Sequence, residues 1–174
     1  MTLNALLNND DDTVIYWGTS GQRLTNNWGL CPFGKIELLE NGRLLFGNDF
    51  RHLVGYPSRA EVIEAIKQTY ENLRKYGAKY PGIGWFLDTA RCLYTLKTNK
   101  VIAKTKAGEW AIKENICPDV SVMKKIIEIR KNPLEFRNNK ETRSWNKEIL
   151  EWEKTLIPYL QRFVDVLELE LRTM

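Results

Sequence analysis

The sequence lacks any long hydrophobic run. No apolar stretch approaches the roughly 20 residues that are needed to span a bilayer, so we expect no membrane-spanning helix. The N-terminal segment from Met1 to Asp12 also lacks a basic region followed by an apolar run, which excludes an ordinary secretory signal. These two absences lead us to expect a cytoplasmic protein.

Residues that bind metals are scarce. The chain contains 3 cysteines and 1 histidine. Cys31, Cys92 and Cys117 lie far apart in the sequence, no Cys-x-x-Cys pair is present, and His52 has no cysteine or histidine at ligand spacing. This distribution argues against a zinc site. We expect the cysteines to be structural and reduced.

The excess of positive charge is small. The chain carries 26 Lys and Arg against 22 Asp and Glu, a net charge of +4, which does not by itself indicate binding to nucleic acid. The basic residues are nevertheless concentrated after Asp88, the nearest acid, at positions Arg91, Lys97, Lys100, Lys104 and Lys106. Such a local patch suits a phosphate-bearing ligand. The alternative is a solvated helix end with its loop.

A length of 174 residues, 43% of them hydrophobic, is enough to bury the core of one domain. The part up to about Pro57 reads as mixed α/β. It contains a β-type run, a Gly-, Ser- and Asn-rich stretch and two short apolar segments (Thr13–Trp17, Gly18–Gly29, Lys35–Leu39, Arg43–Phe46). Asn41-Gly42 predicts a hairpin between the apolar segments, or else a short helix turns there into a strand. Residues 1–57 are too few for a core of their own, so they form a partial segment of something larger.

From Ser58 onward the pattern is helical. Ser58 and Glu61 have the spacing of a capping box. Apolar residues at helical spacing predict helices over Ser58–Gly77, Ile83–Lys97, Lys104–Asn115, a segment that starts at Pro118–Asp119, and Glu141–Leu171. Pro158 should kink the last of these. We therefore predict a mainly α fold, in which residues 58–174 form an antiparallel bundle of about five helices.

Two basic residues flank the break between the second and third of these helices. Arg91 lies on the second helix and Lys104 begins the third, 13 positions later and across a turn, so their side chains can converge. An arginine can clamp two phosphate oxygens, and a lysine adds a mobile point charge. The amides at a helix start also favour an anion. This pair is our candidate phosphate site; the alternative is that both are ordinary surface residues.

The segment around this pair resembles the C-terminal helical domain of the aminoglycoside nucleotidyltransferases, specifically the streptomycin/spectinomycin adenylyltransferases. The residues that carry the resemblance are Thr89-Ala90-Arg91, Leu93-Tyr94, Thr98-Asn99-Lys100, Lys104 and Ala107-Gly108-Glu109-Trp110-Ala111. The likeness extends from about Ser58 to the C-terminus. Ile36 to Gly47 matches more weakly and is similar to the segment that joins the two domains of the family.

The resemblance implies a two-domain antibiotic-resistance enzyme that closes on ATP, Mg²⁺ and an aminoglycoside, and transfers AMP to a hydroxyl of the drug. It also implies that Arg91 and Lys104 contact the nucleotide triphosphate, with Lys100 beside them. Residues 1–57 would then be a remnant or edge of the nucleotidyltransferase domain. Trp110 is expected to be a core aromatic rather than a ligand contact.

The sequence departs from the family where the chemistry is carried out. The family needs a Gly-Ser turn followed by an Asp-x-Asp pair, because two carboxylates hold magnesium against the phosphates, and a further carboxylate acts as base. After Gly18-Thr19-Ser20-Gly21 the next acid is Glu37, which has no second acid at Asp-x-Asp spacing, and the acidic run Asp10–Asp12 precedes the turn. We therefore predict a ligand-binding domain that lacks metal ligands and is inactive alone.

Recognition of a cationic drug is also altered. The loop Lys79–Trp85 contains no acid, whereas the family carries acidic residues there. Asp88 is a candidate replacement, or else a helix-surface aspartate, and Trp85 either stacks on a sugar ring or packs in the core. Two other interpretations stay open. A separate catalytic chain would complete the enzyme, or the chain is a non-enzymatic nucleotide or nucleic-acid binding module. Self-association through the apolar N-terminal segment also stays open.

Overall fold

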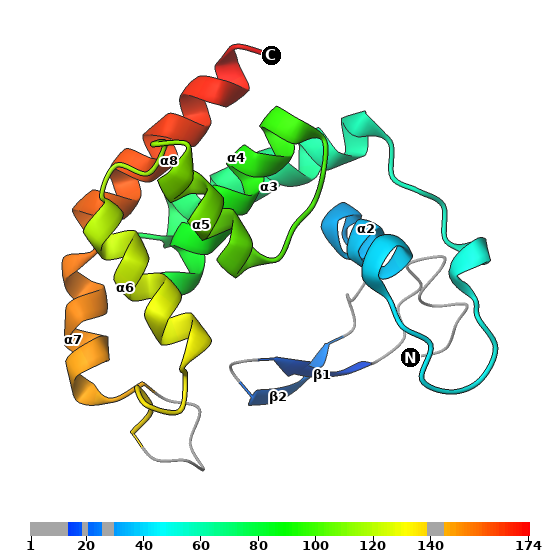
Figure 1. Cartoon of the computed structure of the whole chain (residues 1–174), viewed down its shortest axis with the longest axis horizontal. Helices are drawn as coiled ribbons and strands as arrows, with labels where there is room; N and C mark the ends of the chain where they lie inside the picture. The colour runs from blue at the N-terminus through cyan, green and yellow to red at the C-terminus, as the bar shows by residue number, and fades with distance from the viewer. Residues whose placement is uncertain (1–13, 19–20, 26–29, 139–144) are drawn as a thin grey trace. The chain divides into compact units, whose positions relative to one another are not determined.

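A computed structural model of the chain describes residues 14–18, 21–25, 30–138 and 145–174 (Figure 1). The chain divides into two compact units, residues 1–65 and 66–174, and helix α3 crosses the division. The boundary that we predict at residues 57/58 lies inside the first unit and stays a prediction. None of the helices in the described residues is both long and apolar enough to cross a membrane.

The first unit holds a hairpin and a helix. Strand β1 (Val14–Gly18) pairs antiparallel with β2 (Gly21–Thr25), so that Val14 lies opposite Thr25. The β-type run is thus confirmed as a strand, and its partner β2 lies in the Gly-, Ser- and Asn-rich stretch that follows, for which the sequence predicts no strand. Helix α2 (Pro32–Asn41) follows, with Phe33 and Ile36 buried.

The hairpin predicted at Asn41-Gly42 is wrong, and the alternative of a helix is correct for its first half. Pro32 lies in the first turn of α2, where its missing N–H costs nothing. Gly42 ends the helix, and its N–H donates to the carbonyl of Leu38 at 3.0 Å. The strand expected over Arg43–Phe46 is irregular chain instead, in which the Leu45 side chain is 94% exposed. A single 3-10 turn, η1 (Arg51–Leu53), precedes α3.

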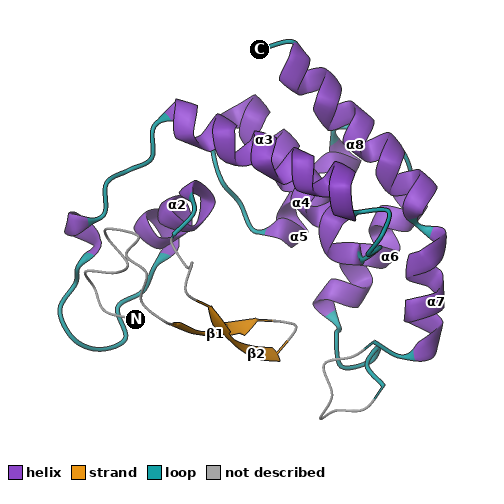
Figure 2. Ribbon diagram, turned by 180° about the vertical axis from the view of Figure 1, so that it is seen from behind, coloured by secondary structure: helices purple, strands orange, loops and turns teal. Residues whose placement is uncertain are grey.

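The mainly α fold is confirmed from residue 59 onward (Figure 2). The helices are α3 (Arg59–Tyr76), α4 (Ile83–Thr98), α5 (Lys104–Lys113), α6 (Val120–Lys131), α7 (Lys147–Thr155) and α8 (Ile157–Arg172). The capping box is confirmed, since the Ser58 and Glu61 side chains each bond the other's backbone N–H. Over the described residues from 145 onward, the single kinked helix predicted over Glu141–Leu171 is wrong; residues 141–144 lie outside the described part. Pro158 lies in the first turn of α8, so the chain ends α7 and starts a new helix rather than kinking one.

The core of the second unit lies between α4, α5, α6 and α8. Helix α4 contacts α5, α6 and α8, and its inner face buries Phe86, Leu87, Ala90 and Leu93, as the spacing predicts. Gly108 allows the close approach of α4, α5 and α6. A Cβ atom at that position would lie 3.0 Å from Leu87 Cδ2, 3.2 Å from Met123 Sδ and 3.3 Å from Ile127 Cδ1.

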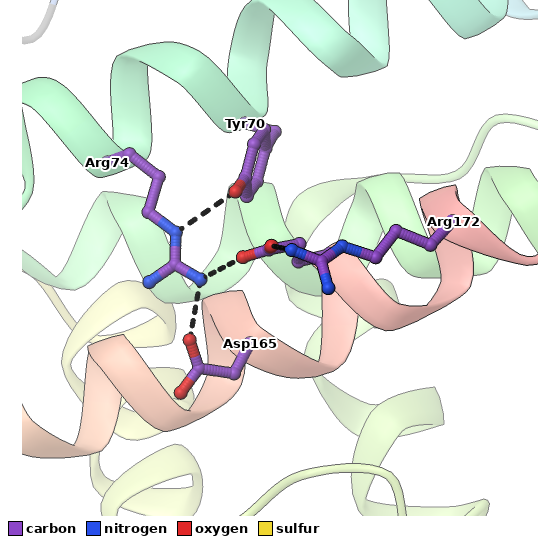
Figure 3. Close-up of polar contacts among 5 residues, drawn as sticks. Tyr70, Arg74, Asp165 and Arg172 are labelled. Atoms are coloured by element: carbon purple, nitrogen blue, oxygen red, sulfur yellow. Dashed lines mark hydrogen bonds and ion pairs between the residues drawn. The ribbon is translucent and has the colours of Figure 1, made fainter.

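Charged residues join α3 to α8 at the surface (Figure 3). Arg74 Nη2 donates to Asp165 Oδ1 at 2.6 Å and to Glu168, which also accepts from Arg172. The Arg74 Nε–H donates to the Tyr70 hydroxyl at 3.3 Å. Arg74 is therefore the centre of a network rather than one member of an isolated pair.

Candidate functional site

The candidate site is built on two neighbouring helices, α4 and α5, and the short loop between them (Figure 2). Asn99 ends α4 in the left-handed conformation, with φ 59° and ψ 17°, which asparagine tolerates better than most residues. Val101 in the loop is buried and holds it against the core. This turn brings the start of α5 beside the middle of α4.

Two cations and one carboxylate meet at this place. Lys104 Nζ lies 2.7 Å from Asp88 Oδ1, and Arg91 Nη2 lies 3.4 Å from the same oxygen. The Asp88 and Arg91 side chains are 19% and 16% exposed, whereas that of Lys104 is 36% exposed. The two basic side chains thus converge on one oxygen atom. Their contact with a nucleotide stays a prediction.

The start of α5 adds to the positive potential. Ala103 precedes the helix and provides no side-chain cap, and the first turn contains no acid. An uncapped helix N-terminus carries partial positive charge and free N–H donors, which favour an anion. Lys104 lies in this first turn, so its ammonium group and the backbone N–H groups of α5 both attract an anion.

Lys100 lies in the loop between the helices and is exposed. Its backbone N–H donates to the Thr98 hydroxyl at 3.2 Å. Lys97 belongs to a different contact, because its ammonium group pairs with Glu170 of α8 at 2.6 Å. The basic cluster seen in the sequence is therefore divided: Arg91 and Lys104 share one partner, and Lys97 faces α8.

Trp85 lies in the first turn of α4 and is half-buried. Its indole N–H donates to the carbonyl of Tyr80 at 2.9 Å, which ties the helix to the loop before it. Trp110 is also half-buried, and its ring meets that of Tyr94 edge-on at a centroid distance of 5.3 Å. The structure thus gives both tryptophans a packing or bonding role within the chain, while a role of Trp85 in stacking on a sugar stays a prediction.

Sequence reasoning missed Glu153. This carboxylate is 7% exposed and accepts the backbone N–H of Ile83, the first residue of α4, at 3.0 Å. Burial raises the pKa of Glu153, and the hydrogen bond from Ile83 opposes this in part. No local signal in the sequence could have found the contact, since 70 positions separate the two residues.

The cysteine beside the cluster is not reactive. Burial, helped by the charge of Asp88, raises the pKa of the Cys92 thiol to about 12, so the thiolate is scarcely populated at neutral pH. In the part of the chain that the structure describes, no three or more His, Cys, Asp or Glu side chains are grouped as metal ligands would be. The acidic run Asp10–Asp12 lies outside that part.

The described residues thus form a mainly helical unit in which two basic side chains from adjacent helices meet one carboxylate. The family model described as "Aminoglycoside adenylyltransferase, C-terminal domain" matches residues 53–155. The match covers more than half of the chain, and the protein belongs to this family. Comparison with curated proteins and with solved structures gives no significant match.

Proposed function

We propose that this chain is the nucleotide- and acceptor-binding part of an aminoglycoside adenylyltransferase, in which Arg91 and Lys104 bind the triphosphate of ATP. Membership of the family supports the use of ATP and Mg²⁺. The observation that carries the proposal is that both cations already reach one anionic oxygen, Asp88 Oδ1. A phosphate oxygen can replace that carboxylate oxygen because it makes the same charge-assisted hydrogen bonds.

In this proposal Lys100 contacts the outer phosphates of the nucleotide. Its side chain is exposed in the loop that leads to α5, and a long, mobile lysine can reach the outer phosphates of a nucleotide. The uncapped start of α5 supports the same placement of the triphosphate.

The acceptor would bind on the side of Trp85 and Asp88. Trp85 is half-buried at the start of α4, where a sugar ring could stack on it. Asp88 is a nearby carboxylate for a cationic amino sugar, and it becomes available once Arg91 and Lys104 turn to the phosphates. The drug class and a role in antibiotic resistance follow from the family and are part of the proposal.

The chain is proposed to be inactive alone. AMP transfer of this kind needs paired carboxylates that hold magnesium against the phosphates. The sequence has no Asp-x-Asp or Asp-x-Glu after Gly18-Thr19-Ser20-Gly21, which supports a need for carboxylates from a separate catalytic chain or domain. ATP as substrate also suits the expected cytoplasmic location.

Titration of the full chain with Mg-ATP tests the binding part of the proposal. Arg91→Ala and Lys104→Ala should each weaken binding by about tenfold or more, because each removes a charge-assisted hydrogen bond. Lys113→Ala is the matched control, since Lys113 is an exposed lysine at the other end of α5. Equal affinities in all four proteins would refute the assignment of Arg91 and Lys104.

The basic cluster supports one second candidate, a non-enzymatic module that binds nucleic acid. Binding to an oligonucleotide should then fall steeply with salt, because several phosphates would release counter-ions. A chain that binds Mg-ATP but shows no salt-dependent binding to RNA or DNA excludes this candidate.

A further inference from the structure

We infer that Asp88 is an internal counter-ion of the nucleotide site, which lowers the affinity of Arg91 and Lys104 for polyphosphate until a phosphate displaces it. The inference rests on the proposed function, because it names what sets the affinity of that same site. It concerns a specificity-determining residue, one that controls how strongly the site attracts a polyanion.

The geometry gives Asp88 the position that a ligand oxygen would take. One of its oxygens, Oδ1, accepts from Lys104 at 2.7 Å and from Arg91 at 3.4 Å. Asp88 lies one turn before Arg91 on α4, whereas Lys104 comes from α5, so the carboxylate joins the two helices. All three side chains are partly exposed, which leaves room for a ligand to reach them.

The charge of the cluster follows from these contacts. Two cations and one carboxylate leave a single net positive charge where the two cations alone would present two. A polyphosphate that binds Arg91 and Lys104 must break the contacts with Asp88 and then lie close to its negative charge. Asp88 therefore opposes binding twice, through competition and through repulsion.

Asp88 also favours binding in one way, but this effect is smaller than its opposition to binding. Asp88 also holds the two cations in place, and its removal would let them move. Loss of a partly exposed ion pair changes an affinity by less than about fivefold, whereas one elementary charge a few ångströms from a phosphate changes it by on the order of tenfold at a protein surface. Removal of the charge should therefore tighten polyphosphate binding.

The test is a titration of the full chain with inorganic tripolyphosphate, followed by Mg-ATP, in wild type and Asp88→Asn. Asparagine keeps the shape and a hydrogen-bond acceptor but removes the charge. We expect Asp88→Asn to bind tripolyphosphate on the order of tenfold more tightly and to show a steeper dependence on salt. Asp88→Ala should shift the affinity in the same direction.

Glu109→Gln is the matched control. Glu109 lies on α5, is exposed and pairs with Lys131 at 2.6 Å, so this variant also removes one negative charge and one ion pair. It should change the affinity by less than about twofold, because the charge of Glu109 pairs with Lys131 of α6 and is exposed to solvent, where salt screens it. A gain of equal size in Glu109→Gln would show a general charge effect and overturn the inference.

The outcomes separate this inference from the proposed function. The inference is overturned if Asp88→Asn binds tripolyphosphate no more tightly than wild type does. The proposed function still stands in that case if Arg91→Ala binds more weakly than wild type. If neither wild type nor Asp88→Asn binds tripolyphosphate or Mg-ATP, both are wrong. Circular dichroism of each folded variant shows that the affinities refer to the same fold.

Discussion

The carboxylate of Glu153, on α7, accepts the backbone N–H of Ile83 at the start of α4, with an oxygen-to-nitrogen distance of 3.0 Å. Gly82, which precedes Ile83, has no side chain that could cap the helix. A carboxylate from a distant helix thus takes the place of a local cap. This contact fixes the start of the helix that carries Asp88 and Arg91.

Removal of this cap should destabilise the fold. Glu153→Ala leaves the N–H of Ile83 buried without its acceptor, and we expect a loss of about 1–2 kcal/mol in the free energy of unfolding. Glu153→Gln retains an acceptor oxygen and should lose much less. Urea denaturation of the three proteins measures the difference, and equal losses in both variants would argue against a capping role.

The same residue should make stability depend on pH. Burial raises the pKa of Glu153 above its ordinary value of 4.5, so the folded chain holds this proton more tightly than the unfolded chain does. The stabilisation by the protonated form is complete below pH 4.5 and is lost as the pH rises through the raised pKa. Glu153→Gln is neutral throughout, so its stability relative to wild type should improve over that interval. A difference that stays constant from acid to neutral pH would contradict the assignment.

Gly108 should be intolerant of a side chain. Its Cβ position lies 3.0–3.3 Å from atoms of Leu87, Met123 and Ile127, so Gly108→Val would force α4, α5 and α6 apart. We expect a loss of about 1–3 kcal/mol in stability. Gly84→Ala is the control, because a Cβ there meets nothing within 4 Å. It should stabilise α4 by up to about 1 kcal/mol; a stable Gly108→Val protein would disprove the packing described above.

The network around Arg74 should contribute more than an isolated surface pair. Arg74→Ala removes contacts with Asp165, Glu168 and Tyr70, and we expect a loss of about 1 kcal/mol that shrinks in 1 M salt. Lys154→Ala, which breaks only the exposed pair with Glu151, should cost less than about 0.5 kcal/mol. Thermal denaturation at two salt concentrations compares them. Identical small losses would mean that the network adds nothing.

The helices of the second half could be predicted because their signals are local. The spacing of Ser58 and Glu61 marks the start of α3, and Asp119 caps the start of α6. Apolar residues recur along one face of each helix. The positions of Arg91 and Lys104 on either side of a turn were enough to expect that they converge. Local pattern therefore predicted helices α3 to α6 and the convergence of these two basic side chains.

What the sequence could not predict depends on contacts between distant residues or on competing local signals. Asn41-Gly42 is a strong turn signal, but it serves here as a helix end. Pro158 starts a helix as readily as it kinks one, and the choice depends on packing. The bond from Glu153 to Ile83, and the placement of Asp88 between two cations, exist only once the helices have packed.

Transfer of labelled AMP from ATP to a panel of aminoglycosides, by the purified chain with magnesium, measures whether the chain is catalytically complete. We expect no sustained turnover by this chain alone, together with Mg-ATP binding that weakens in Arg91→Ala and Lys104→Ala. Sustained turnover that is lost in Arg91→Ala would show instead that the chain holds a complete metal site of its own.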